Sequence, residues 1–114
     1  MVESQGSEQV LVAGPLFLDV VMGPLGHAPV PGQEQWVPGC ALGPGGAANQ
    51  AVALARLGAR AALASYVGED AAGDLVRGLL AQEGVRLDAL EAVERQSVTV
   101  SLALDGDRAM TSFG

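Results

Sequence analysis

Short apolar runs alternate with stretches of helix-forming residues, and this alternation constrains the fold of the chain more than any other feature. Residues 9–14 form a continuous apolar run, which is typical of a buried parallel strand, and residues 60–68 are predicted as the next strand. Helices are predicted at residues 47–57 and 71–83, the first largely buried among Ala, Val and Leu, the second capped by Asp70. Strands that alternate with helices predict an α/β fold around a parallel sheet.

A second part of the sequence does not fit that alternation and predicts a small β appendage. Residues 98–104 alternate apolar and polar side chains, and Asp105-Gly106 is a strong hairpin signal. Residues 108–113 can therefore return as an antiparallel strand. A further strand is expected at about 33–42, although Pro38 demotes it to an edge or interrupted strand.

Composition and charge exclude several classes of function. The 114 residues suit one small domain, expected over residues 9–114 behind a loose leader at residues 1–8. The net charge of −7, with six basic residues, argues against nucleic-acid binding, and no apolar run is long enough for a membrane span. The single cysteine, Cys40, and the single histidine, His27, argue against disulfides and a metal site and favour a cytoplasmic protein.

Asp19 is the first candidate binding residue. It interrupts the apolar run of residues 16–22, just past the end of the first predicted strand. Ligands of open α/β sheets bind outside the carboxyl ends of the strands. A carboxylate among apolar neighbours needs hydrogen-bond partners, which a polyhydroxy ligand would supply. A turn or capping aspartate is the alternative, and by position alone it is the commoner case.

Gly45, Gly46 and Asn49 form the second candidate site. Glycine lets a ligand approach the backbone, and an asparagine in the first turn of a helix offers a donor and an acceptor to hydroxyl groups. A tight loop that leads into a buried helix is the simpler alternative. Residues 43–48 also fit the G-x-G-x-x-A dinucleotide fingerprint, although no clean strand precedes them, so a dinucleotide-binding fragment remains a less favoured alternative.

Taken together, these features resemble the N-terminal portion of the PfkB carbohydrate kinase family, also called ribokinase-like. The double glycine, the asparagine and the later Ala-Arg-Leu-Gly resemble the first signature of that family, and Val-Gly-Glu-Asp-Ala-Ala-Gly-Asp resembles the run that follows it. The segments that carry the resemblance are residues 14–19, 31–34, 45–58 and 67–74.

The resemblance implies both a fold and an activity. The fold would be ribokinase-like, namely the N-terminal part of a mainly parallel sheet with flanking helices and a small β lid at about 33–42 and 98–113. The activity would be ATP-dependent phosphorylation of a sugar hydroxyl, with Mg²⁺ bridging the ATP phosphates. The lid of such kinases covers the sugar and often mediates homodimerisation.

The resemblance also assigns individual residues. Asp19, Gly45, Gly46 and Asn49 match positions that contact the sugar in the family. Trp36, Met110 and Ser112 would add contacts from the lid. Two residues separate the double glycine from Asn49, where ribokinases proper carry three, so the resemblance does not extend to ribose as the substrate.

The second signature of the family, which carries a Gly-x-Gly-Asp run with the catalytic base, does not occur in this sequence. We therefore assign no catalytic residue and no nucleotide site to the chain, and expect residues 1–114 alone to be inactive. The alternative is a truncated, non-catalytic module that binds sugar or assembles through its lid.

Overall fold

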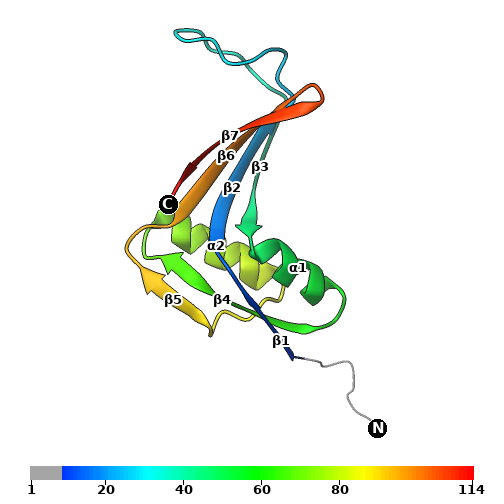
Figure 1. Ribbon diagram of the computed structural model, residues 1–114, viewed down its shortest axis with the longest axis vertical. Coiled ribbons are helices and arrows are strands. Elements are labelled where there is room, and N and C mark those ends of the chain that lie inside the picture. The colour runs from blue at the N-terminus through cyan, green and yellow to red at the C-terminus, as the bar shows by residue number, and fades with distance from the viewer. Residues whose placement is uncertain (1–8) are drawn as a thin grey trace.

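The computed structural model describes residues 9–114, and the predicted leader at residues 1–8 lies outside the described residues. The described chain divides into a base and a tall lid that rises from it (Figure 1). In chain order the elements are β1 (Gln9–Ala13), β2 (Leu16–Gly23), β3 (Gly39–Gly46), α1 (Ala48–Arg56), β4 (Arg60–Gly68), α2 (Ala71–Gln82), β5 (Leu90–Val93), β6 (Ser97–Leu104) and β7 (Asp107–Phe113).

The base is a parallel sheet with strand order β1-β4-β5, as the alternation of strands and helices predicts. Its core combines apolar residues of the sheet and of both helices, with Leu63 and Leu80 fully buried. Side chains at alternate strand positions point the other way. There Leu11 is 64% exposed and Tyr66 is 61% exposed, so the helices cover one face of the base sheet.

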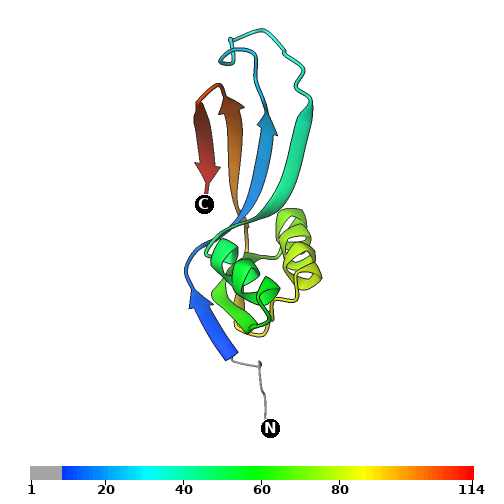
Figure 2. The ribbon, with the colours of Figure 1, turned by 90° about the vertical axis from the view of Figure 1, so that its right-hand side faces the viewer.

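The lid is a four-stranded sheet with order β3-β2-β6-β7, which stands clear of the base (Figure 2). Strands β2 and β6 are parallel, and β3 and β7 flank them antiparallel. The predicted hairpin turn at Asp105-Gly106 is confirmed. Residues 24–38 form the loop at the tip of the lid.

The strands differ from the sequence-based expectation in three places. The lid strand predicted at residues 33–42 runs instead over Gly39–Gly46, because the preceding loop is rich in proline, which cannot donate to a sheet ladder. The apolar run after residue 15 is a full lid strand, β2. Asp19 lies past the end of the base strand β1, as expected, but within this second strand. Strand β5 was not predicted, since its four residues show no periodicity.

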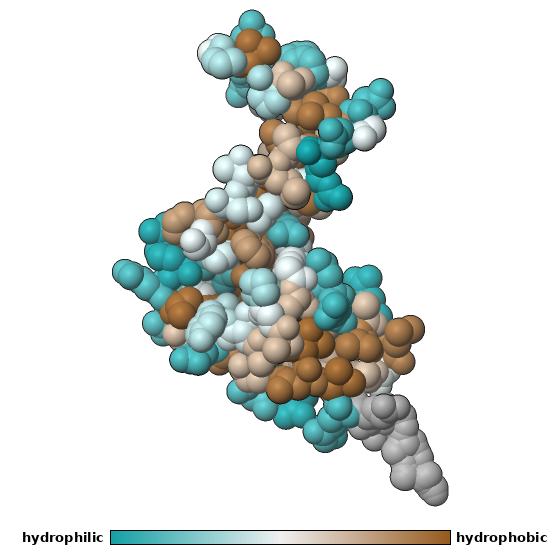
Figure 3. Space-filling model, in the orientation of Figure 1, coloured by the Kyte–Doolittle hydropathy of each residue, from teal (hydrophilic) through white to brown (hydrophobic). Residues whose placement is uncertain are grey.

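The two helices differ in how well the sequence predicts them. Helix α2 begins as expected at Asp70, whose side chain accepts a hydrogen bond from the backbone N–H of Gly73. Helix α1 is less buried than expected, with only Ala48 and Ala51 fully enclosed, because it lies on one face of a small sheet. Leu57, directly after α1, is 84% exposed. Hydrophobic side chains gather on the base in the region of α1 (Figure 3).

Leu80→Ala is expected to destabilise the fold by about 3 kcal/mol, because truncating a fully buried leucine removes apolar contacts and leaves a cavity. Urea unfolding followed by circular dichroism measures this difference. Leu57→Ala makes the same chemical change at an exposed position, and should alter the free energy of unfolding by less than about 0.5 kcal/mol. Equal effects of the two substitutions would contradict this description of the core.

Candidate functional site

The four lid strands present two faces of different chemistry. Asp19 pairs with Gly43 on β3 and with Thr99 on β6, and Thr99 pairs in turn with Ser112 on β7. Paired residues share a face and their sequence neighbours point to the other. The polar face carries Asp19, Ser97, Thr99, Ser101, Arg108 and Ser112, together with the apolar side chains of Phe17, Val21, Ala103 and Met110. The apolar face carries Leu18, Val20, Met22, Leu42, Val98, Val100, Leu102 and Phe113, with Thr111 and Asp107 as its polar members on β7.

Gly45 makes room for the carboxylate of Asp19. The two residues lie on adjacent strands of the polar face, and a Cβ atom at Gly45 would overlap the carboxylate group of Asp19. Gly43, directly opposite Asp19, would meet nothing with its own Cβ. Strand β3 therefore leaves open space beside the Asp19 carboxylate.

Gly46 is required for a different reason. Its backbone has φ = +66°, in the left-handed region that favours glycine. A Cβ atom here would also overlap the carbonyl oxygen of Pro15 and lie 3.1 Å from the ring of Phe17. This residue turns the chain from β3 into α1, so the double glycine ends a strand and does not form the loop that the sequence suggests.

Burial raises the pKa of the Asp19 carboxyl above its usual value, and the positive charge of Arg108 offsets part of this effect. No hydrogen bond from within residues 9–114 contributes to that pKa. Arg108 is the only basic residue of the lid. The carboxylate thus carries a desolvation cost and keeps its oxygens free to accept hydrogen bonds.

Hydroxyl groups lie beside Asp19 on the polar face. Thr99 Oγ1 and Ser112 Oγ are 2.8 Å apart and share a hydrogen bond. Ser101 Oγ is buried and has no hydrogen-bond partner among residues 9–114. Thr99 and Ser101 were missed as candidate residues, although the alternation of residues 98–104 already separates them from their apolar neighbours.

Asn49 lies apart from this arrangement. It is exposed on the first turn of α1 and lines a hollow of about 270 Å³ together with Pro44 and the Arg56–Glu83 ion pair. Asp19 does not line this hollow. Pro44 lies between Gly43 and Gly45 on β3, so it points to the face opposite to that of the two glycines. The structure brings Asp19, Gly43, Gly45 and Thr99 together and leaves Asn49 in a separate hollow.

Of the three predicted lid contacts, two lie on the polar face with Asp19 and one does not. Met110 and Ser112 lie on β7 at positions of the polar face, and Met110 is 63% exposed. Trp36 lies in the loop at the tip of the lid, outside any strand, and is 89% exposed. The strand register therefore groups Met110 and Ser112 with Asp19, but not Trp36.

Two other kinds of site find little support in the described residues. The dinucleotide-like run at residues 43–48 lies largely in an antiparallel lid strand, whereas that fingerprint belongs in the turn after a parallel strand. Residues 9–114 hold no cluster of three or more His, Cys, Asp or Glu side chains suited to a metal ion. None of the helices in this part of the chain has the length and apolar character that a membrane span requires.

Comparisons with known proteins agree with the geometry of the base and lid. Residues 8–113 match the pfkB family carbohydrate kinases. Probable fructokinase-4 of Arabidopsis thaliana is 39% identical over 75 residues, which cover 62% of this chain and 23% of that protein.

Two solved structures are similar over almost the whole chain. Fructokinase from Xylella fastidiosa, solved with bound ATP, has a TM-score of 0.73 and 24% identity, over 95% of this chain and 33% of that one. Ribokinase from Cryptococcus neoformans var. grubii serotype A, solved with ADP, has a TM-score of 0.72 and 31% identity, over 94% and 34% of the two chains.

This chain spans between 23% and 34% of the length of these relatives. The structural likeness confirms the predicted ribokinase-like α/β fold. The family match extends over both the base and the lid, from residue 8 to residue 113. The chain belongs to the pfkB family of carbohydrate kinases.

Proposed function

We propose that this chain is the sugar-binding and lid part of an ATP-dependent carbohydrate kinase. The observation that carries the proposal is the half-buried Asp19 carboxylate on the polar face, which has free oxygens and hydroxyl-bearing neighbours. Sugar hydroxyls are donors that match such a carboxylate, and their hydrogen bonds would offset the cost of its burial. The family of the chain supports a sugar as the ligand.

In this proposal Asp19 accepts hydrogen bonds from two sugar hydroxyls, and Thr99 and Ser112 bond further hydroxyls from the next strands. The bare backbone of Gly43 and Gly45 lets the sugar ring lie against β3. Asn49 would contact the sugar from helix α1, outside the strands that form the polar face. These contacts would hold one hydroxyl in the orientation that phosphoryl transfer needs.

ATP and Mg²⁺ belong to the same proposal, but the described residues do not fit them. No acidic cluster within residues 9–114 suits a divalent cation. The proposed nucleotide site, with its Mg²⁺, would lie in further protein of the kind that the longer relatives contain, since this chain spans 23% of one and 34% of another. The chain would be cytoplasmic, in keeping with its single cysteine.

The uncovered face of the base sheet supports a larger kinase fold. Parallel sheets are normally covered on both faces, yet Leu11 and Tyr66 lie exposed on this one. Further protein would cover these residues in the proposed enzyme. A non-catalytic module that binds sugar or assembles through its lid is the second candidate, and the exposed apolar side chains of the lid favour it.

Asp19→Asn is expected to weaken sugar binding by roughly tenfold or more, because hydrogen bonds to a charged group contribute about 1.5–3 kcal/mol. Calorimetric titration of the protein with fructose and with ribose measures this loss. The same substitution should leave the thermal midpoint at neutral pH unchanged or higher. A raised carboxyl pKa means that the folded state loses stability as pH rises through the interval between the unfolded and folded pKa values.

Asp105→Asn is the matched control, since Asp105 lies in the exposed hairpin turn and Asn-Gly also suits that turn. This variant should bind sugar as the parent does. If Asp19→Asn binds fructose and ribose with the affinity of the parent, Asp19 is not a sugar contact. If the parent binds neither sugar, a panel of other sugars tests the proposed ligand class.

Residues 1–114 alone should show no transfer of phosphoryl groups from ATP to sugar, because the sequence contains no Gly-x-Gly-Asp run to supply a catalytic base. A coupled assay for ADP release, with fructose or ribose as acceptor, measures this. Sugar-dependent turnover above the no-protein control would show that the chain carries its own catalytic base.

The proposal includes a homodimer through the apolar face of the lid. Leu42 is 49% exposed, Val100 37% and Phe113 50%, which is an unusual apolar surface for an isolated sheet. Leu42→Asp should convert a dimer into a monomer, because it places a charge in the proposed interface. Sedimentation velocity measures the change, with Leu57→Asp on the base as control. A parent protein that is monomeric at micromolar concentration would rule out this dimer.

A further inference from the structure

Gln96 is a buried amide at the junction of lid and base. It is 2% exposed and directly precedes β6. Its Oε1 accepts a hydrogen bond of 2.9 Å from the backbone N–H of Gly68, the last residue of β4. Its Nε2 donates bonds of 2.9 Å to the carbonyl of Leu16 and 3.2 Å to that of Ser97. One side chain thus joins the base strand β4 to the lid strands β2 and β6.

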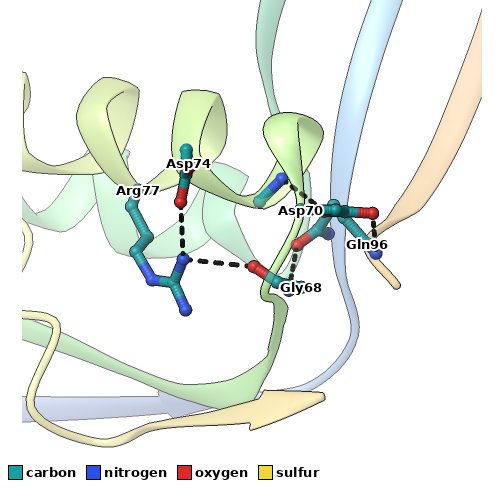
Figure 4. Close-up of polar contacts among 6 residues, drawn as sticks. Gly68, Asp70, Asp74, Arg77 and Gln96 are labelled. Carbon is teal, nitrogen blue, oxygen red and sulfur yellow. Dashed lines mark hydrogen bonds and ion pairs between the residues drawn. The ribbon is translucent and has the colours of Figure 1, made fainter. Parts of the chain in front are cut away.

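Asp70 holds the backbone of Gln96 from the other side (Figure 4). Its Oδ1 accepts the Gly73 N–H at 2.9 Å, and its Oδ2 accepts the Gln96 N–H at 3.1 Å. These two bonds lower the pKa of the Asp70 carboxyl below its usual value. Arg77 completes the group by donating a bond of 3.1 Å to the carbonyl of Gly68.

The junction requires glycine at two positions of the run 67–74. A Cβ atom at Gly68 would overlap the backbone nitrogen of Gln96, and one at Gly73 would overlap the carbonyl group of Gly68. Close contact between β4, α2 and the segment before β6 therefore depends on both glycines. The run of glycines and acids at residues 67–74, which the proposed sugar face does not use, is explained by this junction.

The lid is joined to the base at three crossings of the chain, and Gln96 acts on two of them. Leu16 begins β2 and lies three residues before Asp19, while Gln96 itself lies three residues before Thr99. The third crossing, from β3 into α1, has its own bond of 2.8 Å from the Ala47 N–H to the carbonyl of Pro15. The two central strands of the lid thus take their position on the base from one amide.

We propose that Gln96 is the positioning residue that fixes the orientation of the lid on the base. It does so by satisfying the Gly68 N–H and the Leu16 carbonyl at once, which requires a donor and an acceptor on one side chain. The coupling holds whether or not the lid binds sugar. Its consequence for the distance between Asp19 and the rest of a sugar site rests on the proposed function.

A distance measurement across the junction tests the proposal without any ligand. Spin labels are attached to Cys40, which is exposed on β3, and to an introduced Leu57→Cys at the end of α1. Double electron–electron resonance is recorded on labelled protein diluted with unlabelled protein, so that only distances within one molecule are read. We expect a single narrow distance for the parent, and loss of that narrow distance in Gln96→Met, which fills the same space without either bond.

Gln96→Glu adds a second test, namely a pH dependence of the distance between the spin labels, which a role of Gln96 in packing alone would not produce. When protonated, the introduced carboxyl can accept from Gly68 and donate to Leu16, as the amide does; when ionised, it can only accept. The charged groups around it are Asp70, Arg95 and the Asp74–Arg77 pair. Burial and the charge of Asp70 favour the protonated form. The narrow distance should be present at about pH 5 and lost at about pH 8.

Gln50→Glu is the matched control, because it makes the same chemical change at an exposed position of α1. Its distance distribution should be narrow and independent of pH, like that of the parent. The proposal is overturned if folded Gln96→Met and Gln96→Glu keep the parental distance at every pH. It is also overturned if Gln96→Glu is unfolded even at low pH, since the protonated acid retains the bonds to Gly68 and Leu16.

Discussion

The close approach of backbone to backbone at the junction of base and lid is the constraint on which the rest of the structure depends. The end of β4, the start of α2 and the segment before β6 approach one another so closely that Gly68 and Gly73 have no room for a side chain. Buried polar backbone groups in such a place need partners, and Asp70 and Gln96 supply them. A sheet with only three crossings to the base can then stand clear of it and still have a defined orientation.

The lid sheet itself is organised by the alternation of its strands. Alternation places Asp19 and the hydroxyls of Thr99 and Ser112 on one face, and leaves an apolar surface on the other. A half-buried carboxylate without a hydrogen bond from the described chain costs stability, which is the kind of feature that functional sites retain. In the proposed function, the polar face would bind a polyhydroxy ligand and the apolar face would contact another protein surface.

The sequence predicts elements that follow local rules, in the base and in the lid, better than elements whose position depends on a partner strand. The apolar run of β4 and the capped helix α2 follow local rules, so their bounds are predicted within a residue. The position of β3 depends on its pairing with β2, residues 16–23. Propensity rules consider one segment at a time and so do not include the effect of a partner strand. Asp19 was predicted as a candidate from the sequence. Its neighbours on the polar face, Thr99 on β6 and Ser112 on β7, could not be predicted, because they are set by the register of strands that are distant in sequence.

The double glycine shows why a motif and a ligand contact should be argued separately. Gly45 is needed because the Asp19 carboxylate occupies the space of a Cβ atom, and Gly46 because its backbone is left-handed beside Pro15. Both requirements exist before any ligand is present. The glycines are therefore explained by the construction of the lid alone, and any choice of ligand in the proposed function would depend on side chains of the polar face. Because Thr99 and Ser112 bond each other there, a ligand that bonds either hydroxyl must compete with that pair.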